Sequence, residues 1–396
     1  MNKSITFITT STFGIELDSM IPLIIEYSKQ SKVQIICSNI FSFEKTLDEK
    51  FPIILENKNI SILYLDDIFY LKFFPLNNKF FLKSIIRIYL KFSNLKKMRN
   101  YFDKSELIYA SNYLNSNHNN RHDLVYKHAK ESTAHFIGMP IISWTYWYQS
   151  YFFDFDYFLC SSINEYQDLK KIVNKTKLLN LGCPAYEKSY LDLYKDLNKS
   201  YTTNKANKTA LFIMVNTTNP VYDNYTKVYE DVCSFIRFLE TKKYNCLIKL
   251  HPTSQTIDIK NFKNVGILSN YFIPNSIESM SSQIDISISL LSTAILKCVA
   301  QNIVSITYLP NSLMDIFPKN HPVHGNLFEK IYFKKSDLKN CRVEDFTHVI
   351  KHPEEILSIN ENDQELKYNN FLKIFKPKNA AKNIIDYLNS KTNKYI

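Results

Sequence analysis

The chain has 396 residues and carries 49 Lys and Arg against 38 Asp and Glu, a formal net charge of +11. Only 5 residues are Gly, where average usage would give a chain of this length roughly 28. No two of these glycines lie close together, so the sequence excludes the Gly-rich loops of P-loop proteins and the Gly-rich fingerprint of dinucleotide-binding proteins.

A hydrophobic content of 45% supplies ample material for packed cores, and the length suggests two or three domains. The 7 Cys residues show no C-x-x-C spacing, and several lie in apolar runs. We therefore expect reduced, buried thiols of a cytoplasmic protein, with neither a disulfide scaffold nor a zinc site. The N-terminus lacks a signal-peptide pattern, and no stretch of about 20 residues is free of charge, which predicts no membrane span.

Short apolar runs alternate with amphipathic segments in the first half of the chain. The predicted strands are Ile5–Thr9, Val33–Cys37, Ile60–Leu65, Leu107–Ala110, Pro140–Trp144 and Tyr157–Cys160. The predicted helices are Asp18–Gln30, His122–Phe136 and Glu165–Val173. This alternation is typical of βαβ units around a parallel sheet.

A stretch rich in Asn, Lys, Ser and Thr, Tyr190–Thr209, interrupts the pattern and predicts a linker. A second alternation follows it. The predicted strands are Thr209–Val215, Cys246–Leu250, Val265–Leu268, Ile286–Leu290 and Val304–Tyr308. The predicted helices are Tyr225–Thr241, Ser276–Ser282, Ser292–Ala300 and, at the end of the chain, Asn362–Ser390.

These patterns predict the α/β class, with two Rossmann-like domains that face a cleft. We place the first domain at residues 1–195 and the second at residues 206–365. A helical tail, residues 366–396, is expected to pack back on the first domain. In such folds, ligands bind at the carboxyl ends of the parallel strands.

Polar residues follow three of the predicted strands in the second half. His251-Pro252 comes directly after the apolar strand that includes Lys249, and Ser292-Thr293 follows the strand at 286–290. Asn216-Thr217-Thr218 follows the first strand of this half. Ser292 or Thr293 is expected to be the N-cap of a helix, whose free backbone N–H groups favour an anion. The three strand ends, with Lys249, predict a pocket for a nucleotide mono- or diphosphate.

Each of these motifs also has an ordinary interpretation. A His-Pro pair at a strand end is most often a turn, and Ser-Thr before a helix is most often only a cap. The order of the motifs and their shared domain favour the binding site.

The His-Pro strand and the downstream strand that ends in Ser-Thr resemble the C-terminal domain of bacterial GT-B transferases that build surface polysaccharides. This group includes sialyltransferases, polysialyltransferases, capsular Kdo transferases and the CDP-glycerol polymerases of teichoic acid synthesis. The resemblance covers residues 211–309. It implies that His251, Ser292 and Thr293 hold the phosphate of a cytidine nucleotide, and therefore that the donor is CMP- or CDP-activated.

Two further elements of the family lie upstream. Gly138-Met139-Pro140 resembles its Gly-x-Pro element, and Gly182-Cys183-Pro184 resembles the turn that closes its first domain. Where many relatives have a His-Gly pair, this chain reads Ser143-Trp144-Thr145, and the tight acidic triplet of some sialyltransferases is absent. The resemblance therefore assigns no catalytic base.

Inverting transfer requires a carboxylate or a His that takes the proton of the acceptor hydroxyl. Glu16 and Asp18 follow Gly14 in the segment after the first strand and are the candidates. Their ordinary role would be at a helix start, with Asp18 as the N-cap and Glu16 as a first-turn acid. A second candidate set consists of His118, His122 and His128. The acceptor side of the cleft is expected to include Gly14, Ser111, Asn112, His122 and Trp144.

The segment 79–99 places Lys83, Arg87 and Lys91 four residues apart among apolar side chains. This pattern indicates either a helix that contacts the inner face of the membrane or a core helix with a solvated basic edge. The sequence contains no basic-aromatic RNA-binding motif and no zinc finger, so nucleic acid is not an expected partner.

The sequence thus predicts an inverting, metal-independent glycosyltransferase that needs no cofactor. It would move a sialic-acid-like or Kdo-like sugar from a CMP-activated donor to a bacterial surface glycan, lipooligosaccharide or capsule, and a lipid-linked acceptor would fit the membrane contact. Two alternatives stay open: a CDP-glycerol or other polyol-phosphate transferase, and a non-catalytic nucleotide- or glycan-binding module.

Overall fold

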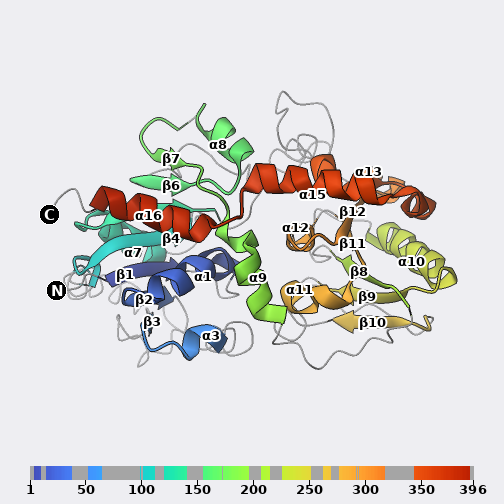
Figure 1. Cartoon of the computed structure of the whole chain (residues 1–396), viewed down its shortest axis with the longest axis horizontal. Coiled ribbons are helices and arrows are strands. Elements are labelled where there is room, and N and C mark those ends of the chain that lie inside the picture. Colours follow the sequence, from blue (N-terminus) through green and yellow to red (C-terminus); the bar gives the residue numbers. More distant parts are fainter. Residues whose placement is uncertain are drawn as a thin grey trace, which may run out of the picture. The chain divides into compact units, whose positions relative to one another are not determined.

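Two parallel β-sheets, one in each of two units, organise the chain (Figure 1). Unit 1 comprises Met1–Ala185 and Pro377–Ile396, and unit 2 comprises Tyr186–Lys376. The structure is a computed structural model. It describes residues 4–9, 15–37, 52–64, 99, 101–111, 120–140, 155–171, 173–195, 207–214, 225–250, 262–268, 276–290, 292, 294–316 and 343–392.

The sheet of unit 1 has seven parallel strands in the order β3-β2-β1-β4-β5-β6-β7. The strands are β1 (Ser4–Thr9), β2 (Val33–Cys37), β3 (Ile60–Tyr64), β4 (Ser105–Ser111), β5 (His135–Met139), β6 (Tyr157–Leu159) and β7 (Lys177–Leu179). Its central strands are buried, which explains why they are continuous apolar runs in the sequence.

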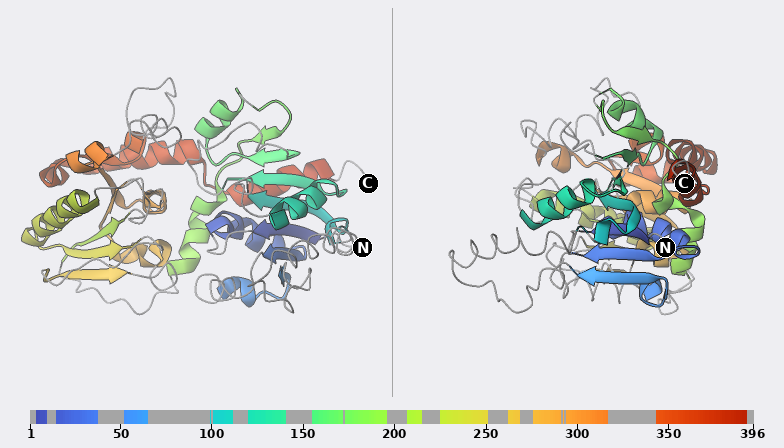
Figure 2. Two further views of the ribbon diagram at one scale, coloured as in Figure 1. Left: turned by 180° about the vertical axis from the view of Figure 1, so that it is seen from behind. Right: turned by 90° about the vertical axis from the view of Figure 1, so that its left-hand side faces the viewer.

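Helices cover both faces of this sheet (Figure 2). One face packs on α7 (Asn120–Lys130) and α8 (Ile163–Leu169) through a single hydrophobic cluster. On the other face, Tyr27 of α1 (Ile15–Ser28) lies against β1 and β4: its hydroxyl is 2.8 Å from that of Tyr109, whose ring stacks on Phe7. The C-terminal helix α16 (Ala380–Thr392) packs against α1, and the short α3 (Pro52–Leu55) precedes β3.

The sheet of unit 2 has six parallel strands in the order β10-β9-β8-β11-β12-β13. The strands are β8 (Thr209–Ile213), β9 (Asn245–Lys249), β10 (Val265–Leu268), β11 (Ile286–Ser289), β12 (Val304–Tyr308) and β13 (His348–Ile350). Successive residues of each strand face opposite sides, so Phe212 and its neighbours Leu211 and Ile213 belong to two different hydrophobic clusters.

One face of this sheet packs on α10 (Tyr225–Thr241) and α13 (Asn311–Ile316). The other packs on α11 (Ile277–Met280) and α12 (Ile295–Ala300). The remaining helices of unit 2 are α9 (Lys188–Lys195), which packs on α11, and α15 (Glu361–Phe375), which packs on α12. Short 3-10 turns are η4 (Pro184–Tyr186), η6 (Ser281–Gln283), η7 (Val343–Asp345) and η8 (Pro353–Ser358).

The predicted helix between residues 122 and 136 is too long. It ran to Phe136, but α7 ends at Lys130, where the Ser132 hydroxyl donates to the carbonyl of Ala129 at 2.6 Å. Phe136 instead belongs to β5, a strand that the sequence did not predict and that pairs with β4 in the middle of the sheet. Of the strand predicted at Pro140–Trp144, Pro140 directly follows β5, and residues 141–144 lie outside the described part of the chain.

The boundary between the units also differs from the expected one. We placed the first domain at 1–195 and a linker over Tyr190–Thr209, but unit 1 ends at Ala185 and α9 belongs to unit 2. The surrounding sequence is polar, but Tyr190, Leu191 and Tyr194 form an apolar stripe along α9 and are buried. The helix packs on α11 of unit 2. The C-terminal tail divides at Lys376: α15 belongs to unit 2, and α16 to unit 1.

The cysteines of the described residues are buried and free of disulfides: Cys37, Cys160, Cys183, Cys233, Cys246 and Cys298. Burial raises the pKa of Cys246 and of Cys298 to about 12, so both thiols stay protonated at neutral pH. The prediction of buried, small hydrophobic cysteines is confirmed for these six. Cys341 lies outside the described residues.

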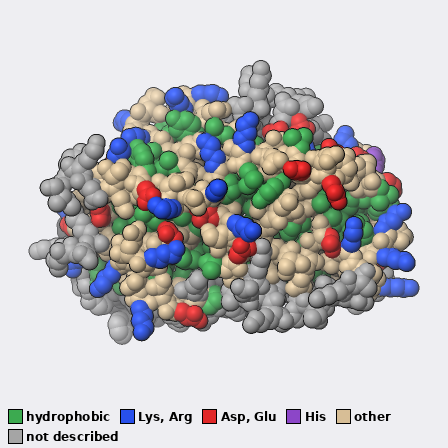
Figure 3. All heavy atoms as spheres, viewed as in Figure 1, with side chains coloured by type: hydrophobic (Ala, Val, Ile, Leu, Met, Phe, Trp, Pro, Cys, Tyr) green, Lys and Arg blue, Asp and Glu red, His purple; other side chains and the backbone are tan. Residues whose placement is uncertain are grey.

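No helix within the described ranges has the length and apolar character that crossing a bilayer requires. On the face of the molecule shown in Figure 3, the described Lys and Arg side chains are scattered, with Asp and Glu among them. The basic stretch 79–99 falls outside the described residues except for Arg99, whose Nε lies 3.9 Å from the Asp103 carboxylate.

Gly138 of β5 lies where a side chain would collide with two aromatic rings. A Cβ atom at this position would lie 2.6 Å from the Phe155 ring and 2.7 Å from the Phe158 ring. We expect Gly138→Ala to destabilise unit 1 by about 1–3 kcal/mol, because a tightly packed core must shift to admit a methyl group. Urea unfolding measures the change, with Gly266→Ala on the edge strand β10 as the matched control. A loss no larger than that of the control would contradict the close approach.

Two half-buried or buried imidazoles predict a loss of stability in acid. Desolvation lowers the pKa of His128, neither of whose ring nitrogens has a hydrogen-bond partner among the described residues. Desolvation also lowers the pKa of His348, against the opposing effect of a hydrogen bond from its Nε2 to the amide oxygen of Gln364. The unfolded chain therefore binds more protons, so this stability is complete above the unfolded pKa of about 6.5 and is lost as the pH falls through the folded values.

The free energy of unfolding is accordingly expected to fall between pH 7.5 and pH 5.5, by at most about 1.4 kcal/mol per pH unit for each imidazole. A His128→Leu/His348→Gln double variant should show a flatter profile, measured by urea unfolding at a series of pH values. An unchanged slope in the double variant would assign the acid sensitivity to other groups.

Candidate functional site

The three predicted strand-end motifs of unit 2 follow three strands that lie side by side. The sheet order places β8 between β9 and β11, and all three strands are parallel. Their carboxyl ends therefore lie at one edge of the sheet, where open α/β sheets bind ligands. The residues His251, Pro252, Thr293, Asn216, Thr217 and Thr218 themselves lie outside the described part of the chain.

Lys249 is the last residue of β9, and its side chain is buried. It pairs in register with Ile213 of β8 and with Leu268 of β10. Its carbonyl accepts the backbone N–H of Met214 at 3.0 Å, which keeps β8 and β9 together up to the point where both strands end. A buried lysine thus ends β9 at the carboxyl edge of the sheet, two residues before His251.

Ser289, the last residue of β11, organises the turn that follows this strand. Its hydroxyl accepts the backbone N–H of Ser292 at 2.8 Å and donates to the carbonyl of Ser292 at 3.2 Å. The Ser292 carbonyl also accepts the N–H of Ile295, the first residue of α12, at 3.3 Å. The turn and the start of α12 are therefore tied to the end of the strand.

The predicted helix cap is wrong. We expected Ser292 or Thr293 to be the N-cap, but α12 begins at Ile295 and its N-cap is Ala294. The methyl side chain of Ala294 makes no capping hydrogen bond. The Ser292 hydroxyl instead accepts the N–H of Ala294 at 3.3 Å, a local serine turn before the helix. The cause is Ser289, whose bonds to Ser292 keep that residue in the turn, so that the N-cap lies two residues beyond it.

This turn leaves Ser292 with a defined hydrogen-bonding role. Its side chain is half-buried, and its hydroxyl oxygen already accepts the Ala294 N–H. The hydroxyl proton is engaged by no partner among the described residues, so the group presents chiefly a donor. Phosphate oxygens at neutral pH are acceptors, which makes this geometry suited to a phosphate group.

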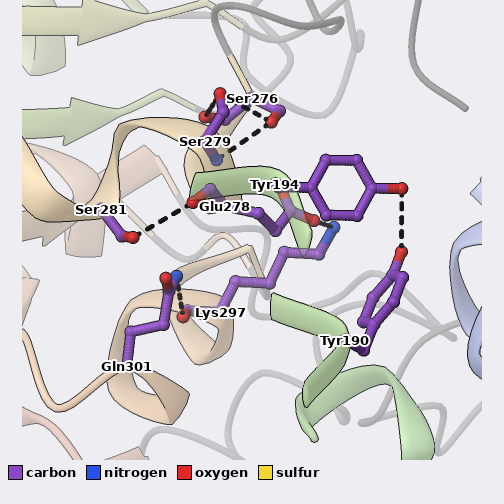
Figure 4. Close-up of polar contacts among 8 residues, drawn as sticks. All are labelled: Tyr190, Tyr194, Ser276, Glu278, Ser279, Ser281, Lys297 and Gln301. Carbon is purple, nitrogen blue, oxygen red and sulfur yellow. Dashed lines mark hydrogen bonds and ion pairs between the residues drawn. The ribbon is translucent and has the colours of Figure 1, made fainter. Parts of the chain in front are cut away.

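An ion pair also joins α12 to the neighbouring helix α11. Figure 4 shows the Lys297 side chain reaching from α12 to the Glu278 carboxylate on α11, with Tyr194 of α9 beside the pair. Glu278 is only 3% exposed, and Lys297 is its partner in the ion pair. The Ser281 hydroxyl donates to the Glu278 carbonyl, and Gln301 donates to the carbonyl of Lys297. The segment after β11 is thus fixed at both ends.

In unit 1, the structure places few of the predicted acceptor-side residues. Ser111 ends β4 and is buried, and its carbonyl accepts the Tyr126 hydroxyl at 2.6 Å. His122 belongs to α7, but its side chain is outside the described set. Gly14, Asn112, Trp144 and His118 lie outside the described residues altogether.

The two candidate bases, Glu16 and Asp18, lie within α1, which begins at Ile15. The predicted helix started at Asp18, so the interpretation of Asp18 as an N-cap is wrong: it is the fourth residue of the helix. The helix extends further because Leu17 is fully buried and belongs to its apolar face. The side chains of both acids are outside the described set, and their catalytic role stays a prediction.

Contacts also place His128 and Asp156. His128 is buried on α7, and its Nδ1 lies 3.7 Å from the carboxylate of Glu131, the residue after the helix. Asp156, the residue before β6, accepts the N–H of Phe136 at 2.8 Å and thus ties the start of β6 to β5. Within the described ranges, no group of three or more His, Cys, Asp or Glu side chains is arranged to hold a metal ion.

Sequence reasoning missed Ser289, Glu278 and Lys297. A signal for Ser289 was present: in Ile286-Ser287-Ile288-Ser289, hydroxyls alternate with apolar residues in a strand whose two faces are both covered. A buried polar residue needs a partner, so such a serine points to a specific hydrogen bond. The Glu278–Lys297 pair joins residues 19 positions apart, and no local pattern marks it.

No protein-family model and no curated protein matches the sequence. Solved structures match its fold. The UDP-GlcNAc 2-epimerase of Neisseria meningitidis, solved with UDP-GlcNAc bound, is 12% identical with a TM-score of 0.59, over 98% of this chain and 100% of that one. The UDP-GlcNAc 2-epimerase of Methanocaldococcus jannaschii is 10% identical with a TM-score of 0.57, over 98% and 99%.

The wall teichoic acid polymerase TagF is 11% identical with a TM-score of 0.58, over 99% of this chain and 89% of that one. A second TagF structure, of a variant soaked with CDPG, is 10% identical with a TM-score of 0.55, over 100% and 90%. At such identities the likeness shows the fold. Together with the two parallel sheets, it confirms the predicted GT-B class of two Rossmann-like α/β domains.

Proposed function

We propose that the chain is an inverting, metal-independent glycosyltransferase that uses a CMP-activated donor. The sugar would be sialic-acid-like or Kdo-like, and the acceptor a bacterial surface glycan of the lipooligosaccharide or capsule type. The proposal rests on the His-Pro and Ser-Thr motifs and on the GT-B fold. Its structural neighbours, solved with UDP-GlcNAc and with CDPG, support a nucleotide-activated substrate.

The observation that carries this proposal is the Ser292 turn. A hydroxyl whose oxygen is occupied by the Ala294 N–H offers its proton to an acceptor at the carboxyl edge of the sheet. Departure of a nucleotide from a sugar leaves negative charge on the phosphate, and positioned donors stabilise that charge. In this proposal, Ser292, Thr293 and His251 bind the leaving phosphate, while Glu16 or Asp18 takes the proton of the acceptor hydroxyl.

The alternative is a CDP-glycerol or other polyol-phosphate transferase. The likeness to TagF, including the CDPG-soaked structure, favours it. Both reactions would use the same phosphate site. They differ in the atom attacked, which is the anomeric carbon of a sugar in the first case and phosphorus in the second.

A donor screen tests the proposal. The full chain is incubated with CMP-sialic acid, CMP-Kdo, CDP-glycerol or UDP-GlcNAc, each with and without lipooligosaccharide, and nucleotide release is measured. Release of CMP from a CMP-sugar supports the proposal, whereas release from CDP-glycerol alone supports the alternative. A thermal shift with CMP or CDP but no release from any donor would identify a non-catalytic binding module.

Membrane association belongs to the same proposal. An enzyme acting on a lipid-linked glycan would work at the inner face of the cytoplasmic membrane, and the basic stretch 79–99 would contact anionic lipid there. Co-sedimentation with phosphatidylglycerol vesicles tests this contact. Binding that is unchanged by replacing Lys83, Arg87 and Lys91 with Gln would contradict it.

A further inference from the structure

Ser289 uses one side chain to satisfy both backbone groups of another residue. It is 1% exposed, and its hydroxyl accepts the Ser292 N–H at 2.8 Å while donating to the Ser292 carbonyl at 3.2 Å. The hydroxyl proton is consumed in the second bond, so Ser289 is fully committed to the turn. These two bonds restrain the backbone of Ser292 and therefore the position of its Cβ atom.

The effect extends to the Ser292 hydroxyl. With its N–H and carbonyl held by Ser289, the residue can turn its own oxygen toward the Ala294 N–H, at 3.3 Å. The Ser292 carbonyl also accepts the Ile295 N–H at 3.3 Å, and the Leu290 N–H donates to the carbonyl of Ile213 in β8 at 3.4 Å. Each bond restrains the backbone that carries the hydroxyl, and together they fix the position of the Ser292 oxygen.

We infer that Ser289 is a positioning residue for phosphate binding by Ser292. The inference rests on the proposed function. Ser289 does not touch the nucleotide; it keeps the Ser292 hydroxyl oriented before the ligand arrives, so that binding does not have to order the turn. Loss of this hydroxyl would free the Ser292 N–H, leave the Ser292 carbonyl with the Ile295 N–H alone, and lower the affinity for a nucleotide phosphate.

The same strand provides a matched control, Ser287. It lies two residues earlier on the same face of the sheet, is fully buried, and its hydroxyl is 2.9 Å from the Ser305 hydroxyl of β12. Ser287 thus has the burial and chemistry of Ser289 but no bond to the turn. If buried serines here only stabilise the sheet, both positions should respond alike.

The experiment compares Ser289→Ala, Ser289→Cys, Ser289→Thr and Ser287→Ala in the full chain. Melting temperatures without ligand measure stability, and isothermal titration with CMP and with CDP measures affinity. We expect Ser289→Ala and Ser289→Cys to raise the Kd for CMP about tenfold, the equivalent of one lost hydrogen bond to the turn. Ser289→Thr, which keeps the hydroxyl, and Ser287→Ala should change the Kd less than about twofold.

Ser289→Cys preserves the volume of the side chain and keeps the test valid if the alanine variant does not fold. Equal Kd values for wild type and both Ser289 variants would overturn the inference, as would an equal weakening in Ser287→Ala. Failure of the proposed function has a different signature: wild type itself would bind neither CMP nor CDP, which would overturn both proposals.

Discussion

Replacing His251 with alanine is expected to lower nucleotide release from the donor by about 10²–10³-fold while the chain stays folded. In the proposed reaction, His251 stabilises charge that develops on the leaving phosphate, and removing one such donor typically has an effect of this size. The preceding strand, β9, ends at Lys249 and holds its place through its pairing with β8 and β10. The turnover number with the donor identified by the screen is the quantity to measure.

The chain offers a matched control for this variant. His352 also precedes a proline shortly after a parallel strand, β13, but it is exposed and its backbone N–H donates to Glu355 at 2.7 Å. We expect His352→Ala to leave the rate within about twofold of wild type, because His352 follows the edge strand β13 and is no part of the proposed phosphate site. Near-normal turnover of His251→Ala, or an equal loss in both variants, would reject the assigned role.

Replacing Lys297 with alanine is expected to destabilise unit 2 by about 3–5 kcal/mol, because it leaves a buried carboxylate without its counter-charge. The Glu278 side chain is 4% exposed and that of Lys297 is 19% exposed, so water can screen this pair only weakly. Urea unfolding followed by circular dichroism measures the loss. The turn that contains Ser292 is bonded to the first residue of α12, and Lys297 holds α12 in place. The same variant should therefore also weaken binding of CMP.

A double variant and an exposed pair make this prediction specific. Glu278→Gln combined with Lys297→Met should recover most of the stability, because neither buried charge remains. Lys382→Ala, in the exposed Lys382–Asp386 pair of α16, should leave the free energy of unfolding close to that of wild type. If Lys297→Ala lowers the free energy of unfolding no more than Lys382→Ala does, then the buried Glu278–Lys297 pair stabilises the fold no more than an exposed pair.

Much of the fold was predictable from local sequence. Residues 225–241, 265–268 and 304–308 form the helix and strands with the bounds that the pattern predicts. Strands buried on both faces must be apolar throughout, and an amphipathic helix repeats its apolar residues every three or four positions, so both leave a strong local signal. The edge strands β7 and β13 were missed because each is three residues long and only partly buried, so neither forms a continuous apolar run.

The site was predictable to a lesser degree. Parallel strands bring their carboxyl ends to one edge, so polar residues after β8, β9 and β11 could be expected together once the alternation was read. The helix cap was misassigned because Ser292 and Thr293 have the residue types of a cap. The hydrogen bond that the Ser292 N–H donates to Ser289 instead decides where α12 begins. Residue type alone does not reveal such a competitor.

The sequence by itself determined the α/β class, the two sheets of parallel strands and the strand ends at which polar residues stand, because each follows from hydrophobic patterning over a few residues. Only the tertiary structure decided how the tail divides at Lys376, which Ser positions the turn, and which acid neutralises Lys297. These depend on contacts between residues brought together by the packing of helices on the sheet. Burial makes such contacts strong, and no short sequence pattern encodes them.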